Sequence, residues 1–191
     1  MERVLTTTGA GADARPVVAR GVERAYDPRV WGSAVGAAGG CVFVLANRGS
    51  LAAPVAVLAL VACVAALAFY VWRVWWRRRP FPEPEPVGRW AGLVYLASVA
   101  GMLVVVRLGR LALGEDHADV LPGVIVLAVG LHFLPFARAF RTPLFARLGL
   151  VMAGLGVVAL VLGLLWTPVA TAAVAVLTGL TMLVLIGRAA G

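Results

Sequence analysis

The chain has 191 residues, of which 62% are hydrophobic, with a mean hydropathy of +0.95 and a formal net charge of +8. A small soluble domain cannot bury so much apolar surface, because a large share of its surface stays in water. The composition therefore excludes a soluble globule and predicts helices that span a lipid bilayer. All 17 basic residues are arginines placed mostly between apolar runs, which favours topology signals over nucleic-acid binding.

Six apolar segments alternate with polar or proline-containing breaks along the chain. A hydrocarbon core of about 30 Å requires about 20 helical residues, and all but the first segment reach this length comfortably. The first segment is short and rich in glycine, so a five-span protein with a re-entrant first segment is the alternative. We predict an all-α fold, a polytopic transmembrane helical bundle within residues 30–187, with spans at about 30–46, 51–76, 89–113, 119–137, 144–166 and 168–186.

Two polar stretches lie outside the predicted spans. Residues 1–29 contain several arginines and no apolar core followed by a cleavage site, so we predict a largely disordered cytoplasmic tail. Residues 77–88 begin with consecutive arginines and continue with proline at alternate positions, which favours an extended cytoplasmic loop. The arginines of this loop suit contact with anionic lipid headgroups.

The distribution of arginines predicts which side each loop occupies. With both termini in the cytoplasm, the tail, the second and fourth loops and Arg188 lie inside, whereas Arg48, Glu115 and Asp116 lie outside. All six tryptophans fall near predicted span ends, where indole rings reach the headgroups. The lysine-free, Ala/Val/Gly/Leu-rich composition is typical of G+C-rich bacterial genomes. We therefore predict a multi-pass protein of the bacterial cell membrane.

Small residues at every fourth position predict where helices pack. Gly32, Gly36 and Gly40 share one face of the first span and form the strongest such stripe. Helices in lipid associate through close contacts between small residues. This stripe predicts a packing face, either within the chain or between copies in a homo-oligomer. Weaker stripes occur at 149–153, 159–163 and 171–179.

His132 is the most deeply placed ionisable residue, in the cytoplasmic half of the fourth span. Pro135, three residues later, cannot donate to the carbonyl of Leu131, so we expect a kink and a free acceptor nearby. The imidazole either donates to such a carbonyl and fixes packing, or it lines a polar path as a proton relay or ligand contact. The packing interpretation is the favoured one.

Arg107 and Arg110 share a face near the outer end of the third span, and three carboxylates follow them at Glu115, Asp116 and Asp119. The favoured interpretation is that both arginines extend to the outer headgroups and pair with these carboxylates. The alternative is an outward-facing pocket for an anion or a lipid headgroup.

Catalytic, cofactor and metal sites are not predicted. The two cysteines, Cys41 and Cys63, lie in different spans and are interpreted as small reduced hydrophobic residues. No P-loop, GxSxG or HExxH motif is present. The sequence therefore favours a protein that is not an enzyme and carries no cofactor.

The run GLHFLPFARAFRTP, from Gly130 to Pro143, resembles a segment of small bacterial multi-span membrane proteins in a family without an assigned activity. The shared pattern is G-x-H-F-x-P-x-A followed by a proline. The resemblance covers the fourth span and the loop after it, and it implies architecture rather than a reaction. It adds interest to His132, Pro135, Arg138 and Pro143.

Two functions are compatible with these features. The glycine stripe and the two charge-poor C-terminal spans favour a structural or accessory membrane component that packs with itself or with a membrane protein partner. The alternative is a small transporter or permease-like protein that uses the kinked fourth span around His132.

Overall fold

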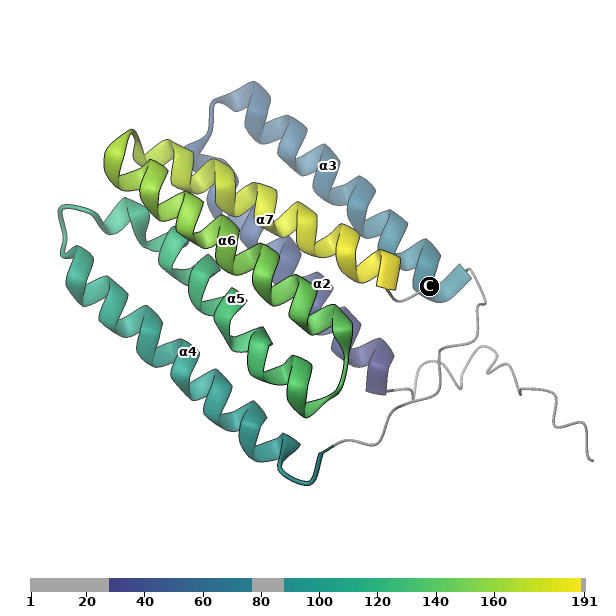
Figure 1. Ribbon diagram of the computed structural model, residues 1–191. Helices are drawn as coiled ribbons and strands as arrows, with labels where there is room; N and C mark the ends of the chain where they lie inside the picture. The colour runs from purple at the N-terminus through teal and green to yellow at the C-terminus, as the bar shows by residue number, and fades with distance from the viewer. Residues whose placement is uncertain (1–27, 77–87, 190–191) are drawn as a thin grey trace, which may run out of the picture.

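The computed structural model describes residues 28–76 and 88–189 (Figure 1). Almost all of the predicted tail 1–29 and of the predicted loop 77–88 therefore lies outside the described residues. Within these ranges the chain is helical and has no strand. The elements in chain order are α2 (Pro28–Asn47), η1 (Arg48–Ser50), α3 (Ala53–Val71), the π-helical turn η2 (Trp72–Trp76), α4 (Ala91–Leu113), η3 (Ala118–Val120), α5 (Leu121–Ala139), α6 (Pro143–Leu165) and α7 (Pro168–Ala189).

Six helices in the described ranges are long and apolar enough to cross a membrane, which confirms the predicted all-α class and the number of spans. The least apolar of them is the first, Val30–Ser50, which still provides 21 residues. Because α2 is continuous over 20 residues, it favours a full span over the re-entrant alternative.

Proline and residues of positive φ mark where helices begin and end. The helices α3, α5 and α6 each have a proline at one of their first two positions, where the missing N–H costs little. At the end of α4, Gly114 adopts a φ of 65°, a conformation that glycine reaches without a steric penalty. Arg141 adopts a φ of 48° in the short turn between α5 and α6.

The C-terminal helix α7 is the centre of the bundle. It contacts α2, α3, α5 and α6, whereas α4 lies at one edge against α5 and α3 lies at the other edge (Figure 1). The buried share of residues is 61% in the α7 span and 11% in the α4 span. The last helix of the chain therefore completes the core, and α4 faces outward along most of its length.

The alternating helix directions separate charge between the two ends of the bundle. We call one end of the bundle the basic end. Here α2, α4 and α6 begin, and α5 and α7 end. Its described arginines are Arg29, Arg73, Arg89, Arg138, Arg141, Arg147 and Arg188. We call the other end the acidic end, because it holds Glu115, Asp116 and Asp119, the three carboxylates of the described residues. Arg48, Arg107 and Arg110 lie nearer to this second end.

Glycines let α5 and α6 approach until their backbones touch. A Cβ added to Gly156 would lie 2.5 Å from both the backbone nitrogen and the Cα of Leu127. One added to Gly130 would collide with the backbone of Met152 and Ala153, and one added to Gly149 would lie 3.0 Å from the carbonyl oxygen of Gly130. The α6 side of this interface thus includes Gly149 and Ala153, at the predicted four-residue spacing, and also Gly156, seven residues after Gly149. Gly163 lies instead against Thr171 of α7 and Val120 of η3.

A second close approach joins α2 to α7. Cβ atoms added to Gly40 and Gly179 would each meet the other residue's carbonyl oxygen, and one added to Gly36 would lie 2.6 Å from the Ile186 side chain. A Cβ at Gly32 would meet no described atom within 4 Å. Two members of the predicted stripe therefore face α7, and Gly32 lies outside this contact.

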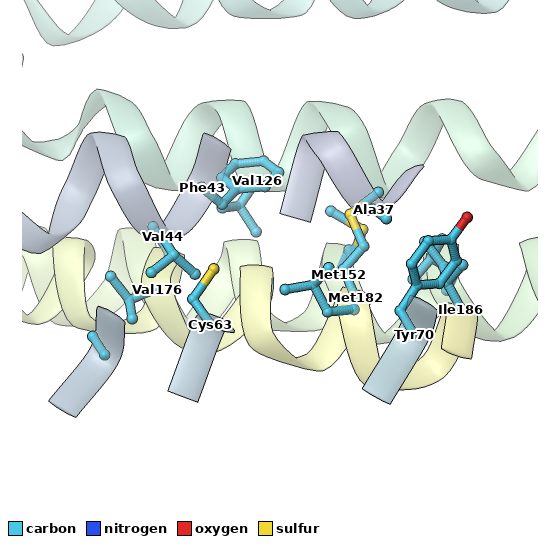
Figure 2. Close-up of a cluster of buried hydrophobic side chains, with 14 of the residues drawn as sticks. Ala37, Phe43, Val44, Cys63, Tyr70, Val126, Met152, Val176, Met182 and Ile186 are labelled. Atoms are coloured by element: carbon cyan, nitrogen blue, oxygen red, sulfur yellow. The ribbon is translucent and has the colours of Figure 1, made fainter. Parts of the chain in front are cut away.

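Five helices contribute side chains to the central apolar cluster. Figure 2 shows Phe43 and Val44 from α2, Cys63 and Tyr70 from α3, and Met182 and Ile186 from α7 around this cluster. Two buried polar residues, Thr171 and Thr178, are both fully enclosed at 0% exposure. The Thr178 hydroxyl donates to the Val174 carbonyl at 2.8 Å, and the Thr171 hydroxyl donates to the Ala159 carbonyl of α6 at 3.0 Å. The buried polar groups of α7 are thus satisfied internally.

Thr171→Val should lower the free energy of unfolding by about 0.6 kcal/mol and by no more than about 1.7 kcal/mol, the average and the maximum measured for hydrogen bonds between membrane helices. Valine keeps the shape of threonine while removing the bond from α7 to α6. Thr181→Val is the matched control, because Thr181 lies on the same helix and is only half-buried. Thermal unfolding in detergent would measure both variants, and equal stability of the two would contradict the prediction.

Candidate functional site

The His132 side chain is bonded to its own helix. Its Nδ1 lies 2.6 Å from the carbonyl oxygen of Val129, three residues earlier on α5. Because a carbonyl only accepts, Nδ1 is the donor of this hydrogen bond. The bond goes to Val129 rather than to the Leu131 carbonyl that Pro135 leaves without its usual donor. The helix α5 continues through Pro135 to Ala139.

Aromatic rings surround His132 near the basic end of the bundle. Its ring centroid lies 4.2 Å from that of Phe133 and 5.1 Å from that of Phe136. Phe136 stacks on Tyr95 of α4 at 5.4 Å, and Phe133 stacks on Phe145 of α6 at 5.8 Å. Such ring pairs stabilise a fold beyond the area that they bury. The cluster therefore joins α4, α5 and α6, and His132 is one of its members.

Two cavities among the described residues lie away from His132. One, of about 290 Å³, opens at the acidic end and is lined by Arg110, Leu113, Gly114, Glu115, Ala118 and Leu121. The other, of about 280 Å³, is an apolar groove on α7 lined by Leu180, Thr181, Val184, Leu185 and Arg188. Neither places a polar path next to the imidazole.

Arg107 and Arg110 are exposed on α4, as expected for side chains that reach toward headgroups. Among the described residues, no ion pair within 4.0 Å joins either guanidinium to Glu115, Asp116 or Asp119, and their pairing stays a prediction. The turn at Gly114 is held by a backbone hydrogen bond, in which the Gly114 N–H donates to the Arg110 carbonyl at 3.2 Å.

Arg73 makes a contact that sequence reasoning missed. Its Nε and Nη2 each lie 3.4 Å from a backbone carbonyl at the end of α7, those of Gly187 and Arg188. Its guanidinium also lies over the Phe69 ring, 6.0 Å from the centroid. A cation at a helix C-terminus satisfies free carbonyls and favours the helix dipole. The only signal in the sequence is one arginine within the aromatic end of the second span.

Polar contacts between α2 and α3 were also missed. The hydroxyl oxygens of Ser33 and Tyr70 lie 2.8 Å apart, and the sulfurs of Cys41 and Cys63 lie 3.9 Å apart. The spacing along the sequence gives no indication of either pair, because the partners come from different spans. In the described ranges no group of three or more His, Cys, Asp or Glu residues could hold a metal ion.

These features define a class: an α-helical bundle of membrane-spanning proportions whose two fully buried threonines bond to backbone carbonyls within the bundle. Comparisons with known protein families, with curated proteins and with solved structures find no match to this chain. The resemblance of residues 130–143 to a bacterial membrane protein family therefore remains a prediction.

His132→Phe should retain the fold, whereas His132→Ala should lose about 1–3 kcal/mol of stability, because each of its two ring pairs contributes about 0.5–1.5 kcal/mol. Phenylalanine preserves the ring contacts to Phe133 and Phe136, and alanine removes them. Thermal unfolding of the two variants in the same detergent measures the difference. If phenylalanine destabilised the protein as much as alanine does, the hydrogen bond to Val129 would be the dominant contribution instead.

Proposed function

We propose that the protein is a structural or accessory component of the bacterial cell membrane. The observation that carries this proposal is the closed core around α7. Glycines bring α2 into backbone contact with α7 and α5 into backbone contact with α6, and the two buried threonines of α7 bond to carbonyls within the bundle. A closely packed core holds the helices in one arrangement.

The separation of charge supports an orientation with both termini in the cytoplasm. The basic end carries seven described arginines, whereas the acidic end carries all three described carboxylates. Loops rich in arginine remain in the cytoplasm. The exposed side chains of Arg138, Arg141 and Arg147 would then face the inner leaflet, where anionic headgroups attract them.

The exposed side of α4 supports an accessory role with a partner in the membrane. Leu96 and Leu103 lie on the span Ala91–Leu113, and their side chains are 64% and 60% exposed on the surface of the bundle. Lipid covers such a face in an isolated protein, and a membrane protein partner or a second copy would cover it in a complex.

The alternative of transport has less support. Its central residue, His132, has one ring nitrogen engaged with Val129 and its ring packed on Phe133 and Phe136. A proton relay needs a chain of polar groups through the bundle. The described polar side chains around α7 instead bond to backbone carbonyls of the helices.

Photo-crosslinking in native membranes tests the proposal. A photoreactive amino acid would replace Leu103 on α4, and as a matched control it would replace Leu150 on α6, which is 65% exposed. We expect the full-length tagged protein to form a discrete protein adduct from position 103 and only lipid adducts from position 150. Lipid adducts alone from both positions, together with a monomer in mild detergent, would contradict an accessory role.

A further inference from the structure

Two thiols that lie far apart in the sequence face each other across the α2–α3 interface. The sulfurs of Cys41 and Cys63 are 3.9 Å apart and belong to residues separated by 22 positions. Figure 2 shows Cys63 on α3 with its sulfur directed toward α2, beside Val44. The chain contains no other cysteine, so each thiol has one possible partner within the molecule.

We propose that Cys41 and Cys63 form a dithiol within the membrane that oxidises reversibly to a disulfide joining α2 to α3. A disulfide places its sulfurs about 2.05 Å apart, so the two atoms need to approach by about 2 Å, which side-chain rotation and a small helix shift can supply. The helices are already adjacent, because Ser33 of α2 and Tyr70 of α3 share a hydrogen bond of 2.8 Å.

The two cysteines differ in how an oxidant can reach them. Cys63 is buried, at 4% exposure, whereas Cys41 is half-buried. A thiol shielded from solvent reacts slowly with external reagents. Cys41 is therefore the thiol that first meets an uncharged oxidant from the lipid, and Cys63 is the resolving thiol beside it.

An uncharged two-electron oxidant of the azo class, such as diamide, can oxidise the two thiols to the disulfide. The thiol of Cys41 adds across the N=N bond, so that its sulfur bonds to one nitrogen and its proton moves to the other. The Cys63 sulfur then attacks the Cys41 sulfur, the S–N bond breaks, and the Cys63 proton moves to the nitrogen that was bonded to sulfur. The two thiols lose two electrons in total, the azo compound becomes a hydrazine, and a dithiol reductant reverses the oxidation.

The disulfide would close a loop through the turn that joins α2 to α3. Cys41 lies about 9 Å from the end of α2, given a rise of about 1.5 Å per residue. This position is nearer to the acidic end, which the proposed orientation places on the oxidising outer side of a bacterial membrane. The sulfur contact itself does not depend on that orientation.

Counting free thiols in the full-length protein tests the proposal. Native membranes are treated with diamide, washed, dissolved in denaturant and exposed to a maleimide carrying a polyethylene glycol chain that shifts the protein on a gel. We expect untreated protein to gain two chains, one for each of its two cysteines. Diamide-treated protein should gain none, and reduction before labelling should restore both. The intact mass after oxidation should be lower by two hydrogen atoms.

The single variants Cys41→Ala and Cys63→Ala are the matched controls. Each should gain one polyethylene glycol chain with or without diamide, because neither can form an intramolecular bond. Two chains on the oxidised wild-type protein would overturn the proposal. So would oxidation that yields only a cross-linked dimer on a non-reducing gel, because the thiols would then pair between molecules. Neither result bears on whether the protein is an accessory component, which photo-crosslinking tests separately.

Discussion

Gly156→Leu is expected to abolish the native bundle, because the new side chain would begin inside the backbone of α5. Its Cβ would lie 2.5 Å from both the nitrogen and the Cα of Leu127. Overpacking by a flexible side chain typically costs about 1–3 kcal/mol, and backbone atoms cannot rotate away as a side chain does. The helices α5 and α6 would have to separate along their shared interface. We therefore expect the free energy of unfolding to fall by more than about 3 kcal/mol.

The measurement is the fraction of monodisperse protein after extraction, followed by its thermal unfolding. Gly154→Leu provides the matched control, because it lies on the same helix two residues earlier and a Cβ there meets nothing within 4 Å. We expect Gly154→Leu to behave as the wild type does. Similar losses in both variants would mean that leucine disturbs insertion or helix formation in general, rather than this interface.

Gly40→Leu is expected to separate α2 from α7, the second close approach in the bundle. A Cβ at Gly40 would lie 2.9 Å from the carbonyl oxygen of Gly179 and 3.0 Å from the side chain of Leu183. Because α7 is the central helix, losing this contact would expose the inner face of α2 and loosen the cluster around Phe43. We expect a destabilisation of about 3 kcal/mol, at the upper end of the usual range for overpacking.

Gly32→Leu is the control within the same helix and the same predicted stripe. A Cβ at Gly32 meets no described atom within 4 Å, so the structure predicts that leucine is tolerated there. Thermal unfolding in detergent distinguishes the two positions. If Gly32→Leu were as damaging as Gly40→Leu, Gly32 would have to pack against something other than the described helices, such as a second copy of the protein.

The sequence predicted the spans because their physical cause is local. Each span is a run of apolar residues long enough for the hydrocarbon core, and each ends at a charge, a proline or a glycine. Gly114 illustrates this, because the positive φ that ends α4 requires a residue without a Cβ. The ends of most predicted spans therefore fall within a few residues of the helix ends.

The arrangement of the helices could not be predicted, because it depends on contacts between spans. Nothing in the composition of α7 marks it as the central helix, since α3 and α6 are at least as apolar. The spacing of seven between Gly149 and Gly156 becomes informative only once α5 is known to be the partner. The thiol pair and the Arg73 contact were missed for the same reason, since each joins residues of different spans.

Accessibility of single introduced cysteines tests the six-span arrangement most directly. In a background of Cys41→Ala and Cys63→Ala, Arg48→Cys reports the turn between α2 and α3, and Glu83→Cys reports the proline-rich segment before α4. We expect a membrane-impermeant maleimide to label position 48 in intact cells, and position 83 only after the membrane is opened. Labelling of both positions from the same side would contradict a full crossing by the second span and with it the six-span bundle.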